Sequence, residues 1–167
     1  MKKIFFASLI TIIIFTACQN TGRPITDQPA SSTTDDSYLE FTVIEGREWV
    51  LIELRSQREI IILDRQRLDA DGMPGIYTIH FQSGKISGMG SPNRFFGSYA
   101  LSAGRSLDIS DIASTMMFSF LQPEGLTESA YFDFLSRTTG WDIYGRRLEL
   151  YSSSADGMEY VLVFVSE

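Results

Sequence analysis

The side chains that could do chemistry are few in this 167-residue chain. His80 is the only histidine, and it alternates with apolar neighbours onto the polar face of its segment. No carboxylate or nucleophile pattern accompanies it, as a general base or a metal ligand would require. We interpret His80 as an exposed bystander. G-x-S-x-G, H-E-x-x-H and P-loop motifs are also absent from the sequence.

One run of acidic residues imitates a metal site. Asp69, Asp71 and Gly72 have the spacing that begins a calcium-binding loop. The later oxygen ligands and the terminal glutamate of such a loop are missing, so we interpret the segment as a turn. We predict no metal site and no cofactor.

Other carboxylates pair by spacing alone: Asp108 with Asp111, and Glu124 with Glu128. Paired carboxylates can act as general acid and base, but helix capping and solvated faces account for such spacings far more often. We therefore name no catalytic residue.

The lone cysteine, Cys18, calls for a different kind of chemistry. A single thiol can form neither an internal disulfide nor a multi-cysteine metal centre. It follows a 13-residue apolar run, residues 5–17, which begins after Lys2 and Lys3. A helix of that length reaches roughly 20 Å, short of the ~30 Å hydrocarbon core of a bilayer, so the layout indicates a secretory signal peptide.

The end of this run, Phe15-Thr16-Ala17-Cys18, resembles the lipobox of bacterial lipoproteins. The resemblance implies a signal peptide over residues 1–17 and diacylglycerol on Cys18. Acyl chains on that residue would hold the protein on a membrane. We expect a cell-envelope location, with the outer membrane or a periplasm-facing leaflet preferred.

Composition divides the rest of the chain into two parts. Residues 19–37 are rich in Ser, Thr, Pro and Asp, which predicts a flexible tether after Cys18. Residues 38–167 are expected to form one folded domain. Loss of two lysines with the signal would take the net charge from −7 to −9. An acidic chain without basic clusters is a poor candidate for nucleic-acid binding.

Alternating apolar residues predict a sheet. The chain closes on 158–165, apolar on both faces, which indicates a well-covered strand. Ser83-Gly84 and Gly145-Arg146 favour hairpin turns. The expected strands lie within 38–44, 49–54, 59–68, 76–81, 85–87, 95–101, 106–109, 141–151 and 158–165.

Two short helices are expected between these strands. Ser110 or Asp111 would cap one over residues 112–120, and Thr127 would cap the other, with Tyr131 and Leu135 on its buried face. The fold class is therefore α+β, a single domain with a strongly curved, mostly antiparallel or barrel-like sheet. Met116, Met117, Phe118 and Phe120 are expected in its core, where they could also line an adaptable apolar pocket.

An ordered set of motifs carries a family resemblance. The set comprises "FQSGKISGMGSPNRFFGSY" at 81–99, "LDISDIASTMM" at 107–117, a helix containing Glu128, "IYGRRLELY" at 143–151, and an upstream Trp49-x-Leu51. Together they resemble the META domain (HslJ-like) family over about residues 46–167. The family's two cysteines fall at Pro92 and Phe118, so cysteine chemistry is excluded here.

The resemblance singles out motif residues whose types suit turns and close backbone contacts. We expect them to maintain the fold rather than bind a ligand, because turn chemistry alone explains them. Arg94 could also pair with a carboxylate or reach a ligand. These residues are Trp49, Gly88, Gly90, Asn93, Arg94, Gly97, Tyr99 and Thr115.

Two functions remain open. The first is a non-enzymatic lipoprotein domain that binds an envelope partner: a lipid or other small apolar ligand, an exported peptide, or a membrane protein. Envelope stress tolerance is the setting that the resemblance implies. The second is a hydrolase that uses carboxylates on envelope glycan or lipid. Two carboxylates about 5 to 9.5 Å apart in a concave site would favour the hydrolase. A dry apolar cavity would favour the binding domain.

Overall fold

The computed structural model describes residues 40–118 and 123–166. The predicted signal peptide over 1–17, Cys18 and the tether to residue 37 lie outside these residues. No helix in the described ranges is long and apolar enough to cross a membrane. The strands are β1 (Glu48–Ser56), β2 (Ile60–Ile62), β3 (Thr78–Gln82), β4 (Lys85–Met89), β5 (Arg94–Ser102), β6 (Ser106–Ser114), β7 (Gly140–Tyr144), β8 (Arg147–Ser153) and β9 (Glu159–Ser166). The helices are α2 (Arg65–Ala70) and α3 (Glu128–Ser136), with a 3-10 turn η1 (Pro123–Gly125).

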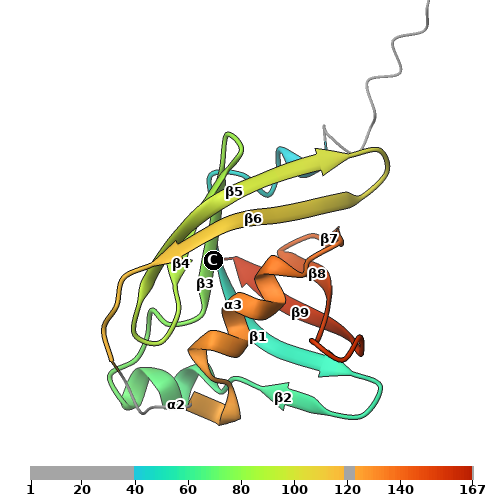
Figure 1. Ribbon diagram of the computed structural model, residues 1–167. Coiled ribbons are helices and arrows are strands. Elements are labelled where there is room, and N and C mark those ends of the chain that lie inside the picture. Colours follow the sequence, from blue (N-terminus) through green and yellow to red (C-terminus); the bar gives the residue numbers. More distant parts are fainter. Residues whose placement is uncertain (1–39, 119–122, 167) are drawn as a thin grey trace, which may run out of the picture. The chain divides into compact units, whose positions relative to one another are not determined.

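The nine strands form one antiparallel sheet, in which all strands except β2 close into a ring. Their order is β2-β1-β3-β4-β5-β6-β7-β8-β9, and β1 also pairs with β9. The ring is joined most thinly between β6 and β7, where Ser106 opposite Gly140 is the one paired position. Helix α3 contacts both β6 and β8 and so covers this join (Figure 1). The mostly antiparallel sheet with two short helices is as predicted from the sequence.

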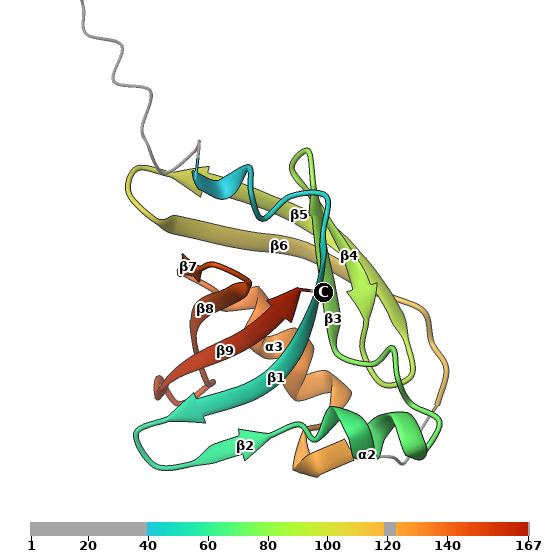
Figure 2. The same cartoon turned by 180° about the vertical axis from the view of Figure 1, so that it is seen from behind.

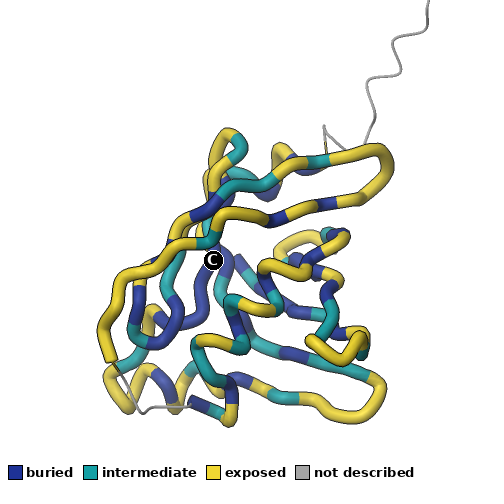
Figure 3. The backbone as a smooth tube through the Cα atoms, in the orientation of Figure 1, coloured by how far each residue is buried: buried dark blue, intermediate teal, exposed yellow. Residues whose placement is uncertain are grey.

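The core lies inside this ring, and the period of two places most of it. Buried and exposed residues alternate along the strands (Figure 3). Trp49, Leu51, Ile79 and Phe81 are fully buried, as their alternation predicts. Strand β9 departs from this alternation, as the sequence also predicted. Val163, on the outer face of the strand, is as buried as Leu162 and Phe164 on its inner face.

The outer face of β9 is covered by an ion-pair cluster. Val163 lies opposite Glu53 on β1 and Glu149 on β8. Glu149 Oε1 accepts hydrogen bonds from Arg55 (2.8 Å) and from Arg147 Nε (3.0 Å). These long side chains cover the valine with their apolar stems while their charged ends pair.

The first expected strand, residues 38–44, is wrong over its described part. Glu40 and Phe41 begin a helical turn, with Val43 N bonded to Glu40 O (3.3 Å) and Ile44 N to Phe41 O (2.9 Å). Phe41 and Ile44, three residues apart, are both buried while Val43 is 47% exposed. The helical spacing of Phe41 and Ile44 therefore places both side chains in the core. A strand would have followed the alternation of Phe41 and Val43 instead.

The helix expected over 112–120 is also wrong where it is described, because β6 runs to Ser114. The register of β5 against β6 shifts between Phe96 and Ser98, which leaves Gly97 opposite two residues of β6. This β-bulge includes Asp111, whose φ of 55° is left-handed. Asp111 thus forms a kink in a strand and caps no helix.

The expected strand over 59–68 is only partly correct. Strand β2 ends at Ile62, and Asp64 then caps α2 by accepting a hydrogen bond from Arg67 N at 3.1 Å. The helix expected from Thr127 is confirmed as α3, with Thr127 accepting from Ala130 N and with Tyr131 and Leu135 buried. The described residues contain two short α-helices, α2 and α3, and α2 is not where the pattern predicted a helix.

The expected core position of residues 116–118 is wrong. Met116 is 98% exposed, Met117 is 54% exposed and Phe118 is 82% exposed. They follow the last residue of β6, beyond the reach of the sheet's interior. Phe120 lies outside the described residues.

Candidate functional site

Asn93 is the centre of a fully satisfied hydrogen-bond network. Its Nδ2 donates to Met117 O (2.9 Å) and to Glu128 Oε2 (2.6 Å). Its Oδ1 accepts from Thr115 Oγ (2.8 Å) and from Met117 N (2.6 Å). Donors and acceptors match at all four positions, which fixes the orientation of the amide. Asn93, 4% exposed, therefore fastens the start of β5 to the segment after β6.

Glu128 fastens the same turn to α3. Its Oε1 accepts from Ser91 N (2.7 Å) and Asn93 N (2.6 Å), in addition to the bond between Oε2 and Asn93. The carboxylate stands in the first turn of α3, where the helix dipole also favours a negative charge. We call the network of Asn93, Thr115 and Glu128 the clamp. Sequence reasoning assigned Glu128 only to capping or a solvated face, although it lay in the family-like helix.

Three motif glycines leave room for neighbouring groups. A Cβ on Gly88 would lie 2.1 Å from Thr78 O, and one on Gly90 would lie 2.5 Å from Glu128 Oε1. A Cβ on Gly97 would lie 2.8 Å from a backbone oxygen of β6. None of the three has a positive φ. Close approach, rather than left-handed backbone, is what these positions require.

The remaining motif residues also have structural contacts. Trp49 is buried and donates from Nε1 to Ile44 O at 2.9 Å. The Tyr99 hydroxyl donates to the Glu45 carboxylate, and burial together with that carboxylate raises the pKa of Tyr99 to about 12. Arg94 is held through its backbone, with its N donating to Thr115 Oγ at 3.2 Å.

A different set of residues lines the outer face of the sheet across β3, β4 and β5. The register aligns His80, Ser87 and Phe96 in one row. This row is shared by two adjoining surface hollows of ≈ 500 Å³ and ≈ 480 Å³. We call it, with the charged residues at its margins, the outer-face site. The charged residues are Glu48, Lys85, Arg94 and Asp111.

Phe96 is the apolar centre of the outer-face site. Its side chain is 62% exposed, while its neighbour Phe95 is 2% exposed and packs inside. Lys85 Nζ donates to Ser98 Oγ at 3.0 Å beside it. Within the described part of the chain, the Arg94 guanidinium has no ion-pair partner. The site thus offers one aromatic ring with charges of both signs around it.

The row has the residue types of a hydrolytic triad without the geometry. Glu48 lies opposite His80, and His80 lies opposite Ser87. Nucleophile, base and orienting acid need hydrogen bonds of about 2.6–3.2 Å between them. No hydrogen bond joins these three side chains in the described structure. The alignment therefore provides no activated serine.

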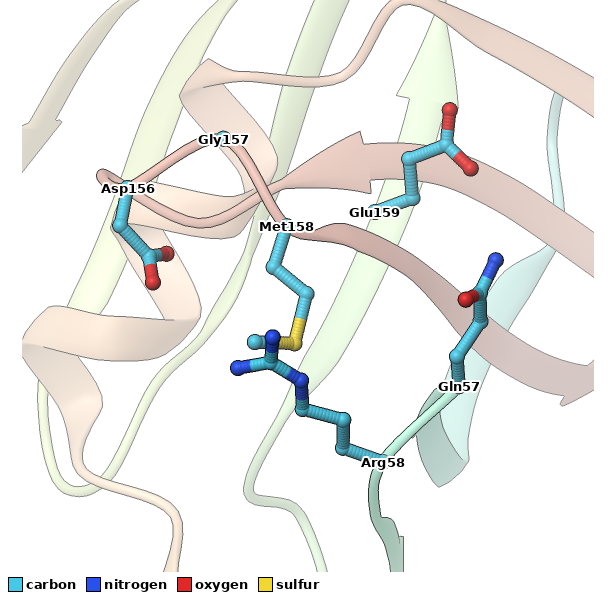
Figure 4. A pocket seen from close by; sticks show the side chains of 6 residues that line it. All are labelled: Gln57, Arg58, Asp156, Gly157, Met158 and Glu159. Atoms are coloured by element: carbon cyan, nitrogen blue, oxygen red, sulfur yellow. The ribbon is translucent and has the colours of Figure 1, made fainter.

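A further hollow of ≈ 420 Å³ lies between the β1–β2 loop and the β8–β9 turn (Figure 4). The Arg58 side chain extends toward Met158 there. A hydrogen bond from Ser154 lowers the pKa of Asp156 on the same turn. The walls are exposed ends of two tight turns, which account for the hollow. No group of three or more His, Cys, Asp or Glu side chains suited to a metal ion occurs among the described residues.

Of the expected site residues, the structure brings Asn93 and Thr115 together with Glu128, and it places Gly90 against them. Trp49 lies elsewhere in the core, and Tyr99 is partly buried against that core. Phe96 was missed as a site residue, although the Phe95-Phe96 pair in an alternating strand necessarily puts one ring outside.

Comparison with known proteins gives a family and a fold. The model of the "META domain" family matches residues 42–163. A protein from Burkholderia xenovorans, solved by NMR, is similar with a TM-score of 0.56 and 20% identity, over 77% of this chain and 87% of that one. A DUF4847 family protein from Bacteroides vulgatus is similar with a TM-score of 0.51 and 13% identity, over 75% of this chain and 96% of that one. No curated protein matches the sequence.

Proposed function

The chain belongs to the META domain family, and from that premise we propose that it is a lipid-anchored cell-envelope protein whose domain binds a polypeptide partner without catalysing a reaction. Acylation of Cys18 after removal of residues 1–17 supplies the anchor, and residues 19–37 supply the tether. Tolerance of envelope stress is the physiological setting that we propose. The binding surface is the outer-face site.

The observation that carries the proposal is the exposure of Phe96 on a strand that is paired on both sides. An aromatic ring 62% exposed at the centre of two hollows resembles the anchor of a protein interface. Strands β4 and β6 hold its strand in place, so the ring is presented from a rigid surface. Little ordering entropy would be lost when a partner covers it.

The charges around Phe96 favour a polypeptide over an anionic lipid. Lys85 and Arg94 stand with Glu48 and Asp111 at the margins of the same hollows. Charges of both signs around an apolar centre are typical of the rim of a protein interface. A membrane of anionic lipids would repel the two acids and the net charge of −9 that remains once Lys2 and Lys3 are removed with residues 1–17.

The test is photocrosslinking in the cells that produce the protein. A benzophenone amino acid at position 96 should give one discrete adduct with an envelope protein, and Arg94→Ala in that chain should reduce its yield several-fold. The same probe at Tyr144, which is 58% exposed on β7, is the matched control and should give no such adduct.

Three results would contradict the proposal: no adduct at position 96, equal adducts at 96 and 144, or an adduct of lipid mass at 96. A small apolar ligand is tested separately by native mass spectrometry of the protein purified from the same cells. A bound mass that is lost on denaturation, and that Phe96→Ala abolishes, would replace the polypeptide partner by that ligand.

A hydrolase gains no support from the site. No hydrogen bonds connect the side chains of Glu48, His80 and Ser87. The strands that carry them, β1, β3 and β4, are each paired on both sides. An oxyanion hole needs free N–H groups aimed at a reacting carbonyl, which a paired strand does not offer.

A further inference from the structure

Strand β2 has a free edge. It stands at one end of the strand order and pairs only with β1, through positions 60, 61 and 62. Every other strand of the described chain lies within the closed ring. Figure 2 shows β2 at the margin of the sheet, with no strand along its other side.

The pairing pattern shows which backbone groups face outward. Glu59 O and Leu63 N, at the two ends of β2, bond to β1 at 2.8 Å and 2.9 Å. In an antiparallel ladder successive residues face opposite edges, so Ile61 also faces β1. The N–H and C=O groups of Ile60 and Ile62 therefore point away from β1, toward the free edge.

The side chains on this edge are apolar and open. Ile60 is 62% exposed and Ile62 is 66% exposed. The turn η1 also contacts β2, yet it leaves both isoleucines accessible. Proteins ordinarily protect a free edge by keeping it short or by lysine, proline or a bulge, because an apolar edge invites another strand. Strand β2 is short, with three residues, but it has none of the other protections. Here the two positions that would protect it are isoleucines.

We infer that β2 is a pairing surface for a second copy of this chain. An antiparallel pair of β2 strands with Ile61 on the two-fold axis sets Ile60 of each copy opposite Ile62 of the other. Both residues have outward N–H and C=O groups, so each such pair exchanges two hydrogen bonds and the interface has four. The four isoleucine side chains then lie together on the outer face. The edge is self-complementary, as a two-fold interface requires.

Charge supports the same register. When this register is extended by two residues beyond each end of β2, Arg58 of one copy lies opposite Asp64 of the other. The two-fold symmetry produces the same pair a second time. Like charges at these positions would have opposed the pairing. The contact is short, well below the roughly 1,200 Å² of a stable interface, so the dimer is weak. Anchoring both copies to one membrane would raise their effective concentration.

Cysteine crosslinking of the full chain in its producing cells tests the inference. In this register residue 60 of one copy lies diagonally about 7–8 Å from residue 60 of the other. Ile60→Cys with a bismaleimide of about that reach should therefore give a covalent dimer of twice the chain mass. Tyr144→Cys, at a position that is 58% exposed on β7 and belongs to neither proposed surface, is the matched control. The unsubstituted chain reports any contribution from Cys18.

A second substitution examines the register. In the Ile60→Cys chain, Ile62→Lys should lower the yield of dimer about tenfold, whereas Ile62→Val should leave it unchanged. The inference is overturned by no dimer from Ile60→Cys or by equal dimer from Tyr144→Cys. A crosslink from position 60 to a different protein would overturn it too, and would assign the edge to a strand of that protein. These outcomes leave the outer-face site untouched, since it lies on other strands.

Discussion

Removal of the Glu128 carboxylate should be among the most destabilising single changes in the domain. The carboxylate accepts from Ser91 N at 2.7 Å, Asn93 N at 2.6 Å and Asn93 Nδ2 at 2.6 Å. Ser91 and Asn93 are 5% and 4% exposed, so water cannot readily replace it. A hydrogen bond to a charged group contributes about 1.5–3 kcal/mol, and a buried unsatisfied donor costs about 1–3 kcal/mol. The two contributions overlap and cannot simply be added over the three bonds. We therefore expect Glu128→Ala to lower the free energy of unfolding by about 3–5 kcal/mol.

Urea unfolding followed by circular dichroism measures this loss as a shift in midpoint at constant slope. Glu128→Gln keeps one oxygen for the two backbone donors and loses the bond to Asn93 Nδ2, so it should cost about 1–2 kcal/mol. The control is Asp133→Ala on the same helix, which removes an exposed pair with Arg137 at 3.5 Å and should change stability by less than ~0.5 kcal/mol. A loss below ~1 kcal/mol for Glu128→Ala would refute the reasoning, because the turn would then hold without the carboxylate.

Three further changes follow from other contacts. Gly97→Ala should cost about 1–3 kcal/mol in urea unfolding, because its Cβ would meet Ser110 O at 2.8 Å; a neutral result would mean that the bulge can relax. Glu149→Ala should cost about 1–3 kcal/mol, since it leaves Arg55 and a second arginine without their shared carboxylate, and Glu149→Gln should cost less. The raised pKa of Tyr99, about 12 against 10.0, contributes stability that is complete below pH 10 and is lost between pH 10 and 12. Tyr99→Phe should therefore flatten the alkaline decline in unfolding free energy, and an unchanged decline would contradict this.

The sequence predicted the strands that obey a period of two with well-marked turns. Ser83-Gly84, where both residues have positive φ, and Gly145 were found because left-handed turns restrict residue choice strongly. Thr127 was found because a helix cap and a buried i, i+4 face agree. Where these local signals are consistent with the ring, sequence reasoning was sufficient.

The failures share a physical cause, which is that tertiary contacts chose between two acceptable local patterns. Residues 112–118 are compatible with a helix, but pairing with β5 and the bulge at Asp111 continue a strand to Ser114. Met116 and Met117 then fall beyond the sheet, where apolar character could not bury them. The ion-pair partners of Glu149 also needed the closed ring, since Arg55 is 94 residues away in sequence.

Residues of the clamp could be predicted from the sequence, whereas the centre of the outer-face site could not. Asn93 and Thr115 were singled out by the family resemblance and expected to maintain the fold, and the structure places both in the clamp. Phe96 was not singled out, because a strand sequence does not say which of its faces a partner would cover. Only the register that aligns it with His80 and Ser87 shows the row.

The clamp and the outer-face site are joined by one strand, and this gives a final prediction. Arg94 N donates to Thr115 Oγ at 3.2 Å, and Thr115 N donates to Arg94 O at 3.0 Å, so the clamp sets the first residue of β5. Phe96 stands two residues further along that strand, on the same face as Arg94. Loosening the clamp should therefore misplace the arginine and the ring together.

Glu128→Gln is the suitable change, since it weakens the clamp at a cost that leaves the domain folded. At a temperature well below its unfolding midpoint, this variant should lose several-fold in crosslinking from position 96, although residue 128 does not line the hollows. Asp133→Ala, on the exposed side of the same helix, should crosslink as the unsubstituted chain does. Unchanged crosslinking in folded Glu128→Gln would show that β4 and β6 alone position Phe96. In that case the motif residues would serve the stability of the ring and have no part in presenting its binding surface.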